Sequence, residues 1–164
     1  MRHGEAEGRS TEGDAARALT PRGIADCRRL AEHFKDDGVA WQAILSSNAR
    51  RARESGELMA AAMEGTAPLE VREELNLAGA HTLLMALQGL PDQADAVLLV
   101  AHNPGVHALT SLLAGRGGGK AARKAARDFP PGALSRLTCD VTAWAHLAPG
   151  AAMLRAFITP KELA

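Results

Sequence analysis

The chain has 164 residues, with 19 basic and 19 acidic side chains and no formal net charge at pH 7. This balance argues against nucleic acid or a membrane surface as a partner, since binding to either is favoured by excess positive charge. The length suits a single domain over residues 1–164, and because aromatic residues are only 3% of the chain, Leu, Val, Ile and Ala must fill its core.

The first half of the chain predicts two helices around a strand. Thr20 precedes a proline, so it is expected to cap a helix over about 21–35, where apolar residues recur at helical spacing. A short apolar segment predicts a strand at 39–46. Ser47 is expected to cap a second helix over about 48–63.

The second half continues this alternation. The strongest predicted strand lies at 96–101, an apolar run typical of a strand buried on both faces of a parallel sheet. Glycines at 115–119 predict a break, and 121–127 is predicted as a small basic helix or a mobile loop. The remaining predicted elements are strands at 68–73, 134–141 and 153–158 and helices at 82–88 and 104–113. The pattern predicts a three-layer α/β/α sandwich with a largely parallel central sheet.

Three polar segments follow predicted strands. Arg2 and His3 stand at the start of the chain, Arg51 follows the strand at 39–46, and His102 follows the strand at 96–101. In open α/β sheets, ligands bind beyond the carboxyl ends of the strands. We therefore expect these four side chains to meet at one edge of the sheet.

Two histidines and two arginines suit phosphoryl transfer. A histidine attacks phosphorus through a neutral ring nitrogen, and nearby arginines keep the ring neutral by disfavouring the imidazolium. Arginine also binds phosphoryl oxygens with paired, charge-assisted hydrogen bonds, and helix N-termini add backbone N–H donors. We therefore expect phosphate or another oxyanion to bind among Arg2, His3, Arg51 and His102, with no metal and no other cofactor.

Other charged and histidine side chains receive a structural interpretation. His102 and His107 could form a metal pair, but a five-residue step places them on different helix faces and no third ligand is near, so we predict no metal site. The basic stretch at 120–127 is interpreted as surface, with contact to an acidic partner as the alternative. Solvent-exposed or structural roles are also assigned to Arg50, Arg53, His33, His81 and His146.

Cysteine usage and hydropathy indicate the cellular compartment. Cys27 and Cys139 lack the spacing of a metal-binding pair, and we expect two reduced thiols. The sequence shows no signal-peptide pattern and no apolar run long enough to cross a bilayer. We therefore expect a cytoplasmic protein with no membrane partner.

These motifs resemble those of the histidine phosphatase superfamily, which has the phosphoglycerate mutase-like fold, and within it the bacterial SixA-type protein phosphohistidine phosphatases. The segment 2–6, Arg-His-Gly-Glu-Ala, resembles the opening motif of the family, and this resemblance implies that His3 is the nucleophile that becomes phosphorylated. The segments 19–23, 47–52 and 101–104 resemble its later landmarks. They imply that Arg51 is a second phosphate-binding arginine and that His102 is the second histidine.

The chain departs from the family pattern in three places. Asn48 stands where the family usually has proline, and Ser55 stands where it often has threonine. Family members also carry a few apolar residues before the methionine of this motif, and here that methionine is Met1. The first strand is therefore predicted to be truncated, and natural upstream residues, where they exist, are expected to pair with 96–101 and to fix His3.

The sequence thus predicts a metal-independent phosphatase that acts through a phosphohistidine intermediate on His3. Glu73 and Glu74 are weak candidates for the acid that an alkoxide leaving group needs, whereas imidazole, with a pKa of about 6.5, needs less help. This favours a phosphohistidine-bearing protein as the substrate and a monomeric enzyme. Two alternatives remain: a small-molecule phosphomonoesterase or mutase of the same superfamily, and a non-catalytic phosphate-binding regulatory module.

Overall fold

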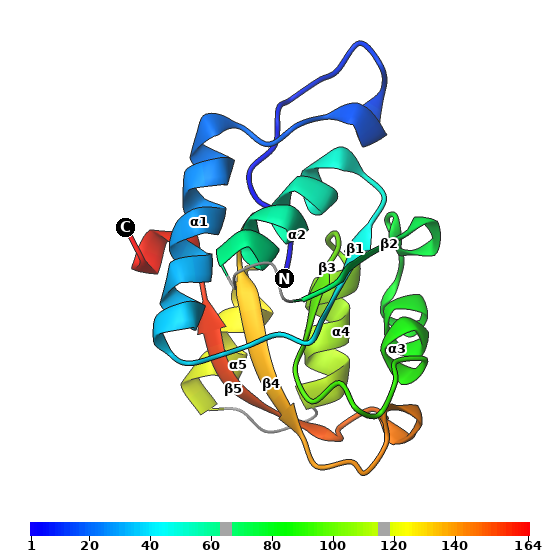
Figure 1. Cartoon of the computed structure of the whole chain (residues 1–164). Coiled ribbons are helices and arrows are strands. Elements are labelled where there is room, and N and C mark those ends of the chain that lie inside the picture. The colour runs from blue at the N-terminus through cyan, green and yellow to red at the C-terminus, as the bar shows by residue number, and fades with distance from the viewer. Residues whose placement is uncertain (63–66, 115–118) are drawn as a thin grey trace.

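The computed structural model describes residues 1–62, 67–114 and 119–164 (Figure 1). The β-strands are β1 (Ala43–Ser47), β2 (Leu69–Arg72), β3 (Val97–Val100), β4 (Leu134–Cys139) and β5 (Ala152–Ile158). The α-helices are α1 (Pro21–Asp36), α2 (Arg50–Ala62), α3 (Ala80–Gln88), α4 (Gly105–Ala114) and α5 (Gly119–Arg127). Short 3₁₀ turns lie at η1 (Asp14–Ala16), η2 (Glu73–Leu75), η3 (Trp144–His146) and η4 (Pro160–Glu162). The predicted helix end at Met63 and the glycine break at 115–118 lie outside the described residues.

The N-terminal residues join two sheets. β1 lies between β2 and β3 and is parallel to both, whereas β4 and β5 form an antiparallel pair. Between these sheets, the His3 N–H donates to the Ala101 carbonyl over 3.1 Å, and the Arg2 N–H donates to the Ala133 carbonyl over 3.0 Å. The segment 1–3 therefore lies where a strand between β3 and β4 would lie, and it runs parallel to β3.

Helices cover both faces of the parallel sheet. Ile44, Leu98 and Val100 pack with the apolar side chains of α1 and α2. The alternate strand positions Leu45, Leu99 and Ala101 pack with α3, α4 and α5. This period-two arrangement follows from the alternating direction of side chains along a strand, and it confirms the three-layer α/β/α prediction. The parallel part is limited to β2, β1, β3 and the segment 1–3.

The predicted element ends are confirmed in some places and wrong in others. The Thr20 hydroxyl accepts from the Gly23 N–H over 3.0 Å, so Thr20 caps α1 as expected. Ser47 does not cap α2, because that helix begins three residues later. Its hydroxyl accepts instead from the Ala49 N–H over 3.2 Å and fixes the turn before the helix.

Four strands, β1 to β4, are shorter than predicted, and one ambiguous segment is resolved. β1 begins at Ala43, since residues 39–42 connect α1 to the sheet and bury Trp41 beside Phe34, with ring centroids 5.7 Å apart. β4 ends at Cys139. The basic stretch at 121–127 is helical and belongs to α5. Within the described residues, no helix combines the length and hydropathy needed to cross a membrane.

Candidate active site

His3 stands at the end of the N-terminal strand segment with one ring nitrogen fixed. Its Nδ1 donates to the Gly4 carbonyl oxygen over 2.8 Å, so the opposite nitrogen, Nε2, carries the free lone pair. The Arg51 Nε–H points at this Nε2 over 3.3 Å. His3 is only 8% exposed. The ring is therefore held in the tautomer that a nucleophile needs.

The backbone around His3 is fixed from two sides. The Gly132 N–H donates to the His3 carbonyl over 2.8 Å. The Gly4 N–H donates to the Ser55 hydroxyl over 2.9 Å, and this hydroxyl donates to the Arg51 carbonyl over 2.7 Å. A side chain at position 4 would come within 2.9 Å of Cys27 Sγ, so the close approach of this turn to α1 requires glycine.

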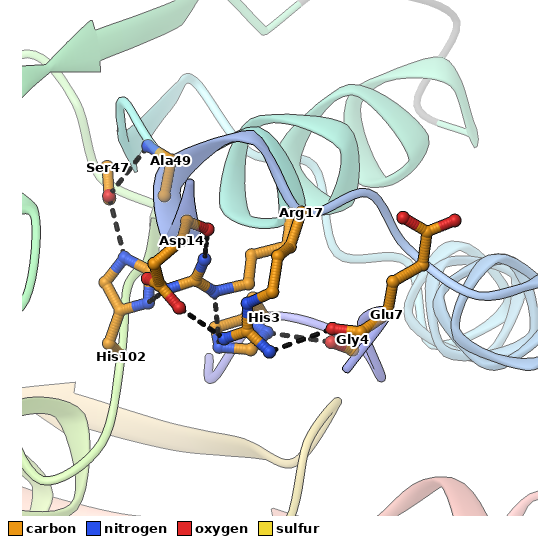
Figure 2. Close-up of polar contacts among 9 residues, drawn as sticks. His3, Gly4, Glu7, Asp14, Arg17, Ser47, Ala49 and His102 are labelled. Carbon is orange, nitrogen blue, oxygen red and sulfur yellow. Dashed lines mark hydrogen bonds and ion pairs between the residues drawn. The ribbon is translucent and has the colours of Figure 1, made fainter. Parts of the chain in front are cut away.

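His102 follows β3 directly and faces His3. The two ring centroids are 5.1 Å apart. His102 Nε2 lies 2.7 Å from the hydroxyl of Ser47, the last residue of β1, and this contact links the ends of two neighbouring strands. His102 Nδ1 lies 3.5 Å from an Arg51 terminal nitrogen. Three of the four side chains that were expected to meet, His3, Arg51 and His102, therefore lie together, and Figure 2 shows the two histidines side by side.

Arg51 lies at the centre of the cluster. It sits in the first turn of α2 and is only 2% exposed. Besides His3, its guanidinium donates to the Asp14 backbone carbonyl over 2.7 Å and to the Asp14 carboxylate over 2.9 Å. Arg17 contacts the other carboxylate oxygen of Asp14 over 2.9 Å. The Asp14 carboxylate thus bridges two guanidinium groups.

Burial keeps both histidines neutral. It lowers the pKa of His3 to about 4, against an opposing hydrogen bond to Gly4, and the charges of Arg51, Arg2 and Arg17 lower this pKa further. Burial also lowers the pKa of His102 to about 3, with smaller contributions from His3 and Arg51. Arginine lowers the pKa of both histidines, as predicted, but burial lowers it more.

Arg2 approaches the site through a backbone anchor. Its guanidinium donates to the Phe129 carbonyl over 2.9 Å, and the Asn103 side-chain amide donates to the same oxygen over 2.9 Å. Within the described structure, Arg2 Nε and Arg17 Nε are buried without a hydrogen-bond partner. Unpaired buried donors are uncommon in proteins, so these atoms indicate where an oxyanion could bind.

Several residues of the site do not lie at the end of a predicted strand. Asp14 and Arg17 lie in and just after η1, in a loop without the periodic pattern of a helix or strand. The spacing of residues along the chain does not indicate that a carboxylate lies among the predicted phosphate ligands. The Phe129 carbonyl is also invisible to residue-based prediction, since any residue supplies a carbonyl. Ser55 was noted only as a departure from the family pattern.

Two other predicted groups lie apart from this cluster. Glu73 and Glu74 are exposed residues of η2, and none of the hydrogen bonds and ion pairs of the described residues joins them to His3 or His102. His107 packs against Phe129, with ring centroids 5.7 Å apart. Among the described residues, no three His, Cys, Asp or Glu side chains come together as a metal site.

Comparisons with known proteins give the family of this arrangement. Residues 1–77 match the model of the histidine phosphatase superfamily (branch 1). An uncharacterised protein of Mycobacterium leprae, ML1117, is 30% identical over 149 residues, which are 90% of this chain and 89% of that protein. A SixA protein of Nakamurella multipartitia, assigned as a phosphohistidine phosphatase, superposes with a TM-score of 0.84 and 28% identity over 98% of this chain and 93% of its own.

A second solved structure shares the fold. The protein histidine phosphatase SixA, complexed with tungstate, superposes with a TM-score of 0.81 and 24% identity over 100% of this chain and 97% of its own. The sequence match, the fold and the paired histidines of the site agree with one another. The chain belongs to the histidine phosphatase superfamily and resembles its SixA-type members.

Proposed function

We propose that this chain is a phosphohistidine phosphatase that works through a covalent phosphohistidine on His3. One observation carries the proposal: His3 Nδ1 donates to the Gly4 carbonyl, which leaves the neutral Nε2 facing the Arg51 guanidinium. A neutral imidazole nitrogen beside a buried guanidinium suits attack on an anionic phosphoryl group. The family supports phosphatase chemistry, and the SixA likeness supports the phosphohistidine substrate.

The reaction then has two displacements. The ring of the substrate phosphohistidine first takes a proton from solvent on its unphosphorylated nitrogen. His3 Nε2 then attacks phosphorus, a new N–P bond forms, and the P–N bond of the substrate breaks as neutral imidazole leaves with that electron pair. Water next attacks the phosphorus, the bond to His3 breaks, and inorganic phosphate is released. Arg51 meets the phosphoryl oxygens in both steps, and Arg2 adds its positive charge, because both guanidinium groups act electrostatically on the His3 ring.

His102 acts after the anion has entered. In the free protein its Nδ1 is directed at Arg51 and the ring is neutral. A phosphoryl group carries negative charge, which raises the pKa of a neighbouring imidazole. His102 can then accept a proton from solvent on Nδ1 and donate it as a hydrogen bond to a phosphoryl oxygen, while Ser47 holds its other nitrogen.

The available carboxyl groups favour an imidazole leaving group. Partial burial works to raise the pKa of Asp14, but hydrogen bonds and charge from Arg51 and Arg17 outweigh it and leave the pKa below its ordinary value. An ionised Asp14 has no proton to give an alkoxide. Imidazole leaves at a pKa of about 6.5 without such help, so phosphohistidine fits the site better than a phosphate ester. We propose a protein as its carrier and a monomer acting in the cytoplasm without a metal.

A trapping experiment tests this proposal. The protein is incubated with phosphoimidazole, quenched without acid and analysed by mass spectrometry, and phosphate is expected on His3. The His3→Ala variant should lose turnover, whereas the His81→Ala control, at an exposed position, should retain it. Chelators should leave the rate unchanged. Phosphate on His102, full activity of His3→Ala, or loss of activity on chelation would overturn the proposal.

A further inference from the structure

α5 carries a basic face beside the candidate active site. Lys120, Arg123, Lys124 and Arg127 recur at spacings of three and four, which places them on one side of a helix, and the helix contains no acidic residue. Ala125 is buried on the opposite side and packs in the core cluster with α4 and β5. The alanines pack α5 against the core, and Lys124 also contacts the Phe157 carbonyl and ring. This packing leaves the function of Lys120, Arg123 and Arg127 open.

This basic face lines a large cavity. The cavity has a volume of about 1050 Å³, and its walls come from α5, the segment 128–131, the start of α1 and the segment 157–161. Phe157, Pro130, Pro131 and Pro160 supply apolar surface. The cavity thus combines a cationic rim with an apolar wall, a combination that suits a polypeptide better than a bare ion.

The acidic residues near the cavity are already engaged. Asp26 pairs with Arg29 and lies 3.8 Å from Arg22, and Glu162 pairs with Lys124. Glu5 lies 4.0 Å from Arg22 and accepts from the Thr20 hydroxyl, and Asp128 acts electrostatically on Arg2. In the described parts of the chain, no salt bridge involves four of the lining cations, which are Lys120, Arg123, Arg127 and Lys161. A chain with no net charge therefore concentrates uncompensated positive charge here.

The cavity shares a wall with the catalytic cluster. The segment 128–131 lines it, and the Phe129 carbonyl within that segment anchors Arg2. The next residue, Gly132, donates its N–H to the His3 carbonyl. Only the segment 128–132 would therefore separate a polypeptide bound along α5 from His3. The same partner could then present a phosphorylated side chain to His3.

We propose that the basic face of α5 and its cavity form the docking surface for an acidic segment of the protein substrate, next to the phosphohistidine. This inference rests on the proposed function. The structure disfavours nucleic acid, because the aromatic ring at the cavity, Phe157, is buried and offers no exposed stacking platform. It disfavours a membrane, because the exposed large apolar residues lie elsewhere, at Val71, Leu77, Met85 and Met153.

Charge reversal tests the docking surface. The variant Arg123→Glu with Arg127→Glu is compared with a control, Arg28→Glu with Arg53→Glu, which changes the net charge equally at exposed positions outside the cavity. The probes are a histidine-phosphorylated peptide flanked by Asp and Glu, its Asn and Gln counterpart, and phosphoimidazole. We expect kcat/KM for the acidic peptide to fall about tenfold or more in the test variant alone, with phosphoimidazole hydrolysis unchanged in both.

Binding separates this inference from the proposed function. Fluorescence anisotropy with a labelled, unphosphorylated acidic peptide needs no turnover, and we expect weaker binding in the test variant and weaker binding at high salt. Failure of phosphoimidazole hydrolysis with intact peptide binding would reject the function and retain the surface. Equal kcat/KM for acidic and neutral peptides, equal losses in both variants, or equally tight binding of single-stranded DNA or anionic vesicles would overturn the docking surface.

Discussion

Acid should destabilise this protein through His102, and the variant His102→Gln should remove that effect. An unfolded chain binds a proton on histidine near pH 6.5, whereas burial lowers the pKa of His102 in the folded protein to about 3. Between these values the unfolded state holds more protons than the folded state. The free energy of unfolding therefore falls as pH decreases from about 6.5 toward about 3.

The magnitude follows from these two values. At pH 7 the linkage costs the folded state well under about 1 kcal/mol, because neither state is extensively protonated. At pH 5 the unfolded histidine is charged and the folded one is neutral, and the cost rises to about 2 kcal/mol. Wild type should thus lose about 2 kcal/mol more than His102→Gln between pH 7 and pH 5, or about 4–8 °C of thermal midpoint.

Urea unfolding at the two pH values measures this difference. The buried Trp41 provides the fluorescence signal. The matched control is His81→Gln, which removes an exposed histidine and should retain the wild-type loss. Phosphate or tungstate should reduce the loss, because an anion near His102 stabilises its charged form. If wild type and His102→Gln lose the same free energy between pH 7 and pH 5, the reasoning from burial is wrong.

Three further variants test the geometry of the site. Arg51→Lys keeps the charge but loses the paired donors, so kcat/KM for phosphoimidazole should fall about 10²-fold, and a rate near wild type would refute the contact. Asp14→Asn should tighten tungstate inhibition by up to about fivefold, because the Asp14 carboxylate competes with tungstate for Arg51 and an exposed ion pair is worth up to about 1 kcal/mol. Weaker inhibition would show that the carboxylate and tungstate do not compete for Arg51. Glu73→Gln with Glu74→Gln should leave phosphoimidazole hydrolysis intact, whereas a loss of about 10²-fold would identify a proton donor.

The sequence predicted the part of the site that the sheet itself positions. His3, Arg51 and His102 each follow a strand or a strand-like segment, and parallel strands bring their carboxyl ends to one edge. The order of residues along the chain was therefore enough to predict their convergence. The predicted helix cap at Ser47 was wrong, because a helix start can shift by several residues while the serine still accepts a hydrogen bond within the turn before the helix.

Tertiary contacts position the parts that the sequence did not predict. The loop that carries Asp14 is held by the Arg17 side chain on the Glu7 carbonyl and by the Leu19 N–H on the Glu54 carboxylate. These contacts join residues up to 35 positions apart and leave no local period to detect. Residues 1–3 are a related case: backbone hydrogen bonds to Ala101 and Ala133, which lie next to β3 and β4, hold the segment that carries His3.

The Asp14 bridge explains how Arg51 can be buried before any phosphoryl group arrives. A guanidinium with 2% exposure needs an anion and hydrogen-bond acceptors beside it, since an unpaired buried charge is strongly destabilising. Asp14 supplies both a carbonyl and a carboxylate, yet its own side chain is 61% exposed and can exchange its partner for water at little cost. A phosphoryl group on His3 would offer Arg51 the same negative charge from the opposite side. The site can therefore exchange one counterion for another without leaving its central cation unpaired.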